Sequence, residues 1–122
     1  MTARVAHRVK LSLDDPLCCV SLTESPLSAT DAAELARVLA ALGDPVRLRL
    51  LSLVAAQGEV CSCNLEAPLG RSQPTVSHHT RVLAEAGLIT GERRGKWMWW
   101  SIVPGRLAEL SRLLGEGAGG SR

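Results

Sequence analysis

The stretch Ser72-Gln73-Pro74-Thr75-Val76-Ser77-His78-His79, continued by TRVLAEAGLI to residue 89, decides the fold of this chain. Ser72 or Gln73 can cap a helix, and Pro74 fits in its first turn. Val76, Thr80, Leu83 and Ala84 then follow at helical spacing until Gly87. The pattern predicts an amphipathic helix over residues 72–86 with one buried face.

A β-hairpin should follow this helix. Residues 88–93 and 96–103 are typical of two strands joined at Arg94-Gly95. On a strand, Trp97 and Trp99 share one face and Trp100 takes the other, so at least one tryptophan should pack in the core. Pro104 begins a last helix that carries four leucines, and the Gly-rich residues 115–122 should be disordered.

Three further helices are expected before residue 72. The first begins at Ser28 or Thr30 and ends at Gly43, and the second has Asp44 as N-cap and ends at Gly58. Residues 61–69 predict a short helix, and residues 1–27 an arm that carries Cys18-Cys19. The expected buried positions are Leu35, Val38, Leu39 and Leu42 in the first helix and Val46, Leu50, Leu53 and Val54 in the second.

This order of elements predicts a mainly α fold with a β-hairpin, a winged helix-turn-helix, over residues 28–114. A chain of 122 residues forms one domain, and a dimer would help it to bury more surface. Such a fold reads double-stranded DNA by placing its second helix in the major groove.

The polar residues fit that function. Residues 71–96 hold five cations and two carboxylates, a local charge of +3, whereas residues 24–70 hold three cations and six carboxylates. The alternative is a solvated amphipathic helix with scattered polar residues. The candidate DNA contacts are Gln73, Thr75, Ser77, His78 and Arg81 on the helix, and Arg93, Arg94 and Lys96 on the hairpin.

Two cysteine pairs, Cys18-Cys19 and Cys61-Ser62-Cys63, predict a site for a soft ion. In a cytosolic chain we expect these cysteines to be reduced thiols, and the alternative is a structural, buried role. As(III) and Sb(III) bind three thiolates, which Cys18, Cys19 and either Cys61 or Cys63 could supply. Side chains two apart on a helix diverge by about 200°, so Cys61 and Cys63 share an ion only if the helix start is unwound.

Four segments together resemble the ArsR/SmtB family of dimeric metal-sensing repressors, and the likeness covers roughly residues 31–112. The segments are LGDPVRLRLLSLV (42–54), EVCSCNLE (59–66), SQPTVSHHTRVLAEAGLI (72–89) and GKWMWWSIVP (95–104). The resemblance implies a homodimer built from the first and last long helices, which binds an inverted repeat and leaves it when the ion binds. It also implies major-groove contacts by Gln73, Ser77 and His78. Most members have Leu where this chain has Thr80, which puts a polar group near the core.

The resemblance also bears on the inducer. Arsenic-responsive members often carry a third cysteine where Glu66 or Ala67 stands here, so Cys18 or Cys19 must replace it; actinobacterial arsenic sensors use such an N-terminal pair. Cadmium and lead sensors combine N-terminal cysteines with a CxC box. We therefore expect an As(III)- or Sb(III)-responsive repressor, with a Cd(II)- or Pb(II)-responsive repressor using all four thiolates as the first alternative.

A repressor switched by oxidation of its thiols to a disulfide is the second alternative. Other classes fit poorly. No nucleophile–base–acid set lies near His78 and His79, so we expect neither an enzyme nor an organic cofactor. Residues 104–116 contain no histidine, which argues against the family's zinc site on the last helix. No apolar run approaches the roughly 20 residues that span a bilayer, and no signal peptide is evident, so we expect a cytoplasmic protein.

Overall fold

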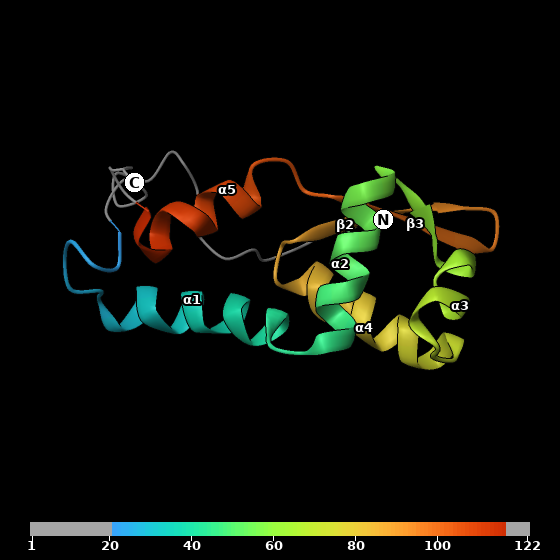
Figure 1. Cartoon of the computed structure of the whole chain (residues 1–122), viewed down its shortest axis with the longest axis horizontal. Helices are drawn as coiled ribbons and strands as arrows, with labels where there is room; N and C mark the ends of the chain where they lie inside the picture. Colours follow the sequence, from blue (N-terminus) through green and yellow to red (C-terminus); the bar gives the residue numbers. More distant parts are fainter. Residues whose placement is uncertain (1–20, 117–122) are drawn as a thin grey trace.

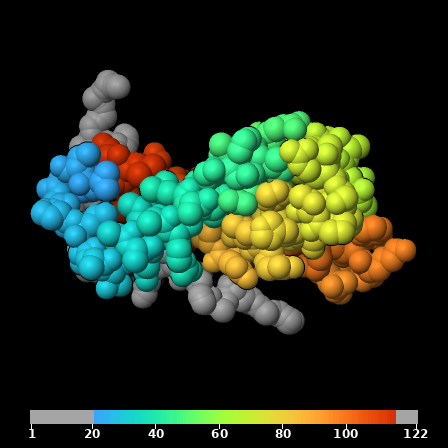
Figure 2. Space-filling model, turned by 90° about the horizontal axis from the view of Figure 1, so that it is seen from below, coloured from blue at the N-terminus to red at the C-terminus, as the bar shows by residue number. Residues whose placement is uncertain are grey.

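The computed structural model describes residues 21–116. Helices α1 (Ala29–Leu42) and α5 (Arg106–Ser111) lie at one end of an elongated molecule (Figure 1). Helices α2 (Pro45–Gln57), α3 (Glu66–Leu69) and α4 (Gln73–Glu85) form the other end with a small sheet, as the space-filling view also shows (Figure 2). No helix within residues 21–116 is long and apolar enough to cross a membrane.

Local capping explains where the first two helices begin. The Ser28 hydroxyl accepts a hydrogen bond from the Asp31 N–H (3.1 Å), so Ser28 rather than Thr30 is the N-cap of α1. The Asp44 carboxylate accepts from the N–H groups of Val46 (2.9 Å) and Arg47 (3.0 Å) at the start of α2. Both predicted helices are confirmed.

The predicted helix over residues 61–69 is wrong. Val60–Cys61 form strand β1, Ser62–Asn64 form a turn of 3-10 helix (η2), and only Glu66–Leu69 are α-helical. The cause lies in the sheet, because Val60 pairs with Trp100 and Cys61 with Trp99 on strand β3 (Trp97–Ile102). Cys61 is therefore extended, and its backbone belongs to the sheet rather than to a helix.

The hairpin is confirmed, with its turn one residue later than predicted. Strands β2 (Ile89–Arg94) and β3 are antiparallel, and Gly95, at φ 68°, permits the tight turn that joins them. The sheet order is β1-β3-β2, so the sequence missed one strand. After α5 the chain continues as a wider helical turn (η3, Arg112–Glu116). Residues 117–122 of the predicted tail lie outside the described part, so the disordered tail stays a prediction.

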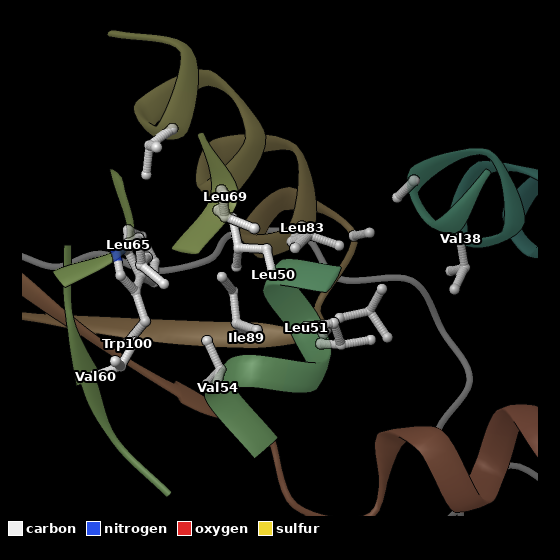
Figure 3. Packing of buried hydrophobic residues seen from close by; sticks show 14 of the residues in the cluster. Val38, Leu50, Leu51, Val54, Val60, Leu65, Leu69, Leu83, Ile89 and Trp100 are labelled. Atoms are coloured by element: carbon white, nitrogen blue, oxygen red, sulfur yellow. The ribbon is translucent and has the colours of Figure 1, made fainter. Parts of the chain in front are cut away.

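The core joins α2 to α4 and to the sheet (Figure 3). Leu50, Val54 and Leu83 are fully buried there, and Trp100 is the tryptophan that packs in the core, as the strand pattern required. Thr80 is buried as expected of its helical position, and its hydroxyl is satisfied by donating to the Ser77 carbonyl (3.0 Å). Several predicted core positions are only partly buried, and Leu51 was missed: Leu42, Val46, Leu53 and Ala84 are half-buried, and Leu39 is exposed.

Replacing Leu83 by Ala should test this core. Leu83→Ala removes a fully buried side chain and should lower the free energy of unfolding by about 2–5 kcal/mol. Leu48→Ala is the matched control on α2, because Leu48 is 50% exposed, and it should change the free energy by less than about 1 kcal/mol. Guanidinium denaturation followed by circular dichroism, at one fixed protein concentration, measures both. Equal losses in the two variants would contradict the assignment of this core.

Candidate nucleic-acid interface and thiol pair

The face of α4 that turns away from the core carries exposed polar side chains. Ser77, His78 and Arg81 are exposed, as predicted from helical spacing, while Val76 and Leu83 are buried. Thr75 is half-buried, and its hydroxyl accepts a hydrogen bond from the Ser72 hydroxyl (3.3 Å). The middle of α4 therefore presents a donor and acceptor surface of the kind that reads base edges and phosphates.

Gln73, the first residue of α4, is partly buried, and its side chain makes hydrogen bonds within the protein. Its Nε2 donates to the Glu66 carboxylate (2.6 Å) and to the Ser62 carbonyl (3.3 Å). Ser62 lies between the two cysteines of the CxC segment. A hydrogen bond thus links the start of α4 to the backbone between the two thiols, a link that sequence spacing did not predict.

The structure joins Cys61 and Cys63 in a disulfide, whereas the sequence predicted reduced thiols. Because Cys61 ends a strand and Cys63 lies in a 3-10 turn, their Cα atoms are only 5.1 Å apart, within the usual disulfide range. Cys61 is buried and Cys63 is exposed, and the Cys63 N–H donates to the Cys61 sulfur (3.1 Å). The helical divergence expected of these side chains does not occur.

This geometry matters for ion binding. After reduction, two sulfurs at this spacing can contact one soft ion without further unwinding of the chain. Within residues 21–116 no group of three or more His, Cys, Asp or Glu side chains is arranged to hold a metal ion. The other predicted ligands, Cys18 and Cys19, lie outside the described residues.

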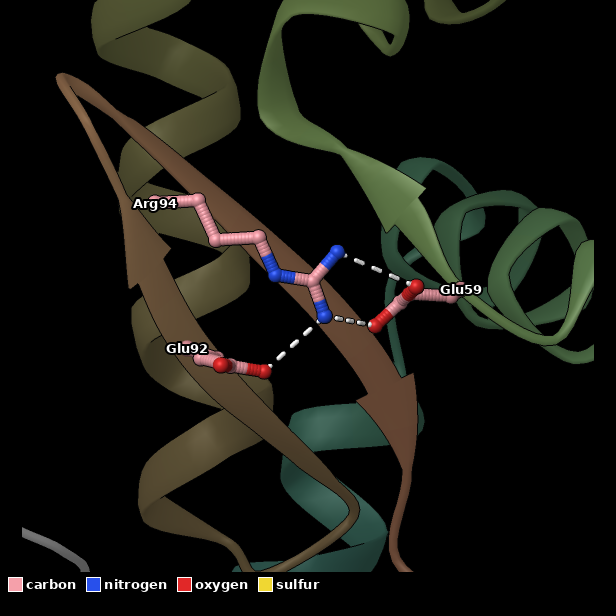
Figure 4. A network of polar contacts seen from close by, with 3 residues as sticks. All are labelled: Glu59, Glu92 and Arg94. Carbon is pink, nitrogen blue, oxygen red and sulfur yellow. Dashed lines mark hydrogen bonds and ion pairs between the residues drawn. The ribbon is translucent and has the colours of Figure 1, made fainter.

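At the hairpin, Arg94 is engaged by the protein itself (Figure 4). Its guanidinium donates to both carboxylate oxygens of Glu59 and to Glu92 (2.9 Å), and it lies 4.9 Å from the centre of the Trp99 ring. The hydrogen bonds that Arg94 donates to Glu59 and then to Glu92 raise the pKa of Arg94 above its ordinary value. Two carboxylates therefore neutralise the positive charge of Arg94, which the sequence predicted to contact DNA.

The two other hairpin cations, Arg93 and Lys96, are exposed near the turn, with Lys96 5.6 Å from the centre of the Trp97 ring. Sequence reasoning missed Glu59 as the partner of Arg94. Glu92 and Arg94 share one face of a strand, which is a readable signal. Glu59 is 35 residues away from Arg94 in the chain, and no sequence pattern predicts the contact between them.

Comparisons with known proteins agree with this architecture. Residues 44–90 match the family model described as "Bacterial regulatory protein, arsR family". An uncharacterized HTH-type transcriptional regulator of Methanocaldococcus jannaschii, MJ1325, is 38% identical over 81 residues, which cover 66% of this chain and 91% of that protein. The arsenical resistance operon repressor of Escherichia coli is 35% identical over 75 residues, covering 62% of this chain but only 64% of the repressor.

Among solved structures, the chain is similar to the homodimeric winged helix-turn-helix DNA-binding domain Mb0332 of Mycobacterium bovis, described as a possible ArsR-family transcriptional regulator. The TM-score is 0.59 at 30% sequence identity, and the match covers 70% of this chain and 82% of that one. The predicted winged helix-turn-helix is confirmed.

The two cysteines of the CxC segment should differ in reactivity after reduction. Brief alkylation of the folded, reduced protein should label Cys63 first, because it is exposed, and Cys61 only when guanidinium unfolds the chain. Tandem mass spectrometry of the peptide that contains both residues separates the two sites. In the control variant Cys63→Ser, Cys61 should stay unlabelled under native conditions; equal labelling rates would show that Cys61 is not buried.

Proposed function

Because the chain belongs to the arsR family of bacterial regulatory proteins, we propose that it is a homodimeric repressor that binds operator DNA until As(III) or Sb(III) binds its thiolates. Family and structural relatives are DNA-binding transcriptional regulators rather than enzymes, and this chain is such a regulator. We infer that it acts in the cytoplasm as a dimer, through the DNA contacts and thiolate ligands described below.

In the proposal, α4 enters the major groove and the hairpin follows the flanking backbone. Ser77, His78 and Arg81 carry the contacts in the middle of α4, and support comes from their exposure opposite the buried face. Gln73 and Thr75 act at the start of the helix. Arg93 and Lys96 reach phosphates from the hairpin, and Arg94, which is paired with Glu59 and Glu92, mainly holds the hairpin in place.

Assembly as a homodimer is supported by apolar surface at one end of the molecule. Within residues 21–116, six large apolar side chains are exposed, and four of them lie on or beside α1, α5 and η3. Pairing of this end would bury them and place two copies of α4 on an inverted repeat. The four side chains are Leu22, Leu39, Leu107 and Leu114.

The single observation that carries the sensing proposal is the link between Gln73 and Ser62. An ion that binds Cys61 or Cys63 acts on the segment whose carbonyl holds the first residue of α4. As(III) takes three sulfurs, and we assign Cys18 and Cys19 as the other two ligands. Moving Ser62 would then displace Gln73 and the start of α4. For decisive release the ion must prefer the DNA-free form by a few kcal/mol.

A redox switch is a second candidate, favoured by the Cys61–Cys63 disulfide. Two thiols would lose two electrons and two protons to hydrogen peroxide, giving the disulfide and two molecules of water. The same Ser62–Gln73 link would transmit this change. In this candidate, DNA release needs an oxidant and is reversed by a thiol reductant, with no ion involved.

Release of DNA by ions distinguishes the candidates. Reduced protein is bound to the fluorescently labelled duplex from directly upstream of its own gene, and anisotropy is followed while arsenite, Cd(II), Pb(II) or peroxide is added. We expect stoichiometric release by arsenite and weaker release by Cd(II). Release by Cd(II) or Pb(II) but not arsenite would assign the four-thiolate site instead. Release only by peroxide would assign the redox switch.

Single cysteine variants refine that experiment. A three-thiolate site uses one of Cys61 and Cys63, so only one of Cys61→Ser and Cys63→Ser should abolish release by arsenite, while both variants still bind the duplex. Loss of release in both variants would favour a site that needs all the thiols. Normal release by arsenite in both variants would exclude Cys61 and Cys63 as ligands.

The hairpin cations should differ in their effect on DNA binding. Arg93→Ala and Lys96→Ala should each weaken binding and reduce the slope of log affinity against log salt concentration by about 1, because each removes a phosphate contact. Arg94→Ala removes a charge already balanced by Glu59 and Glu92, so its slope should stay close to that of the wild type. Anisotropy at several salt concentrations measures the slopes. An equal loss of slope in Arg94→Ala would make Arg94 a phosphate contact.

A further inference from the structure

The guanidinium of Arg47 lies where three helices meet. Its Nε donates to the carbonyl of Ala41 (2.7 Å) and its Nη2 to the carbonyl of Ala40 (3.3 Å), both in the last turn of α1. Its Nη1 lies 3.2 Å from Nδ1 of His79, in the middle of α4. One side chain of α2 therefore connects the end of α1 to the helix proposed to read DNA.

Local structure fixes this position. Asp44 caps α2 and accepts the N–H of Arg47, which holds Arg47 in the first turn of α2, directly after the Gly43 bend. The last carbonyls of any helix lack partners within that helix and carry partial negative charge. Arg47 supplies donors and positive charge to those of α1, so the contact is favourable on both counts.

The contact with His79 depends on protonation. A guanidinium has donors only, so Nδ1 of His79 must accept the hydrogen bond, and it can do so only when the imidazole is neutral. Protonation of Nδ1 removes the acceptor and brings two positive charges within hydrogen-bonding distance of each other. The contact therefore opens when His79 binds a proton.

We propose that Arg47 and His79 form a pH-sensitive clamp that positions α4 relative to α1, so that acidification weakens DNA binding. The inference rests on the proposed function, in which α4 reads DNA and α1 belongs to the dimer interface. Arg47 and His79 are positioning residues in it: they set where the reading face of α4 lies with respect to the second copy of α4, and they need not touch DNA.

The surroundings of His79 favour the closed clamp near neutral pH. Burial lowers the pKa of His79 below its ordinary value of 6.5; Asp44 opposes this shift, and the positive charges of Arg47, His78 and Arg71 add to it. The folded state thus prefers the neutral imidazole. Its contribution to stability is complete above about pH 6.5 and is lost as pH falls from 6.5 through the lower pKa of the folded state. The pKa of Asp44 is itself lowered, chiefly by the hydrogen bond from the Arg47 N–H, so this carboxylate stays ionised throughout.

The first test is a histidine titration by NMR on the full-length, reduced protein without DNA. In the wild type, His79 should titrate below 6.5, and amide shifts along α4 should follow the same titration. In Arg47→Met the pKa of His79 should rise, because a nearby positive charge and donor are gone. Arg47→Gln serves if the Met variant does not fold, since it also removes the charge but keeps a polar side chain. An unchanged His79 pKa in the folded variant would overturn the clamp.

The second test measures DNA binding in a His78→Gln background, which removes the exposed imidazole on the same helix. His78→Gln is compared with the double variant His78→Gln/His79→Asn, in which the Asn amide can accept near the Nδ1 position but does not titrate. With the labelled upstream duplex, lowering the pH from 7.5 to 5.5 should weaken binding by the first protein about tenfold. The double variant should change less than about twofold.

Equal pH dependence in the two proteins would overturn the clamp's role in DNA binding. Circular dichroism at both pH values checks that each protein remains folded, because general unfolding would lower helix content together with affinity. If the wild-type protein does not bind the duplex at pH 7.5, the proposed function fails, and the NMR titration still decides whether Arg47 and His79 are coupled.

Discussion

The apolar contact between α2 and α4 is the constraint on which the rest of the structure depends. Val76 and Leu83 are fully buried, and Leu50 and Val54 of α2 are fully buried in the same core. Successive helical residues are separated by about 100°, so burying this face fixes which side chains point outward. Turning α4 by one residue would bury Ser77 in place of Val76. The same packing energy that holds the fold therefore aims the candidate DNA contacts.

Two polar contacts at α4 add to this packing, which sets the rotation of the helix about its axis. Gln73, in the first turn, donates to the Ser62 carbonyl between the cysteines. His79, six residues later, contacts Arg47, which in turn donates to a carbonyl at the end of α1. A helix moves largely as a unit. Breaking either contact would therefore displace the side chains that lie between Gln73 and His79. In the proposed function, soft ions or oxidants would act at the contact between Gln73 and Ser62, and protons at the contact between His79 and Arg47.

The sequence predicted what is locally encoded. Ser28 and Asp44 cap their helices by contacts within three residues, and the hairpin follows from two adjacent segments. Strand β1 has only two residues and exists because β3, nearly 40 residues later, pairs with it. Because of this long-range pairing, Cys61 is extended and not helical. The side chains of Cys61 and Cys63 therefore do not diverge as they would on a helix. The contact between Glu59 and Arg94 escaped prediction for the same reason.

Pairing across the sheet also changes how the charge of this region should be counted. Residues 71–96 include five cations, but Arg94 is balanced by Glu92 within the segment and by Glu59 outside it. Considering ion pairs within residues 21–116 alone, the exposed cations of this segment that make none are Arg71 and Arg81 near α4 and Arg93 and Lys96 near the hairpin turn. A phosphate backbone that crosses both groups would meet positive charge at two separated places. In the proposed function, electrostatic attraction favours the orientation in which α4 lies between the two sugar–phosphate backbones, and base contacts from Ser77 and His78 would supply the sequence preference.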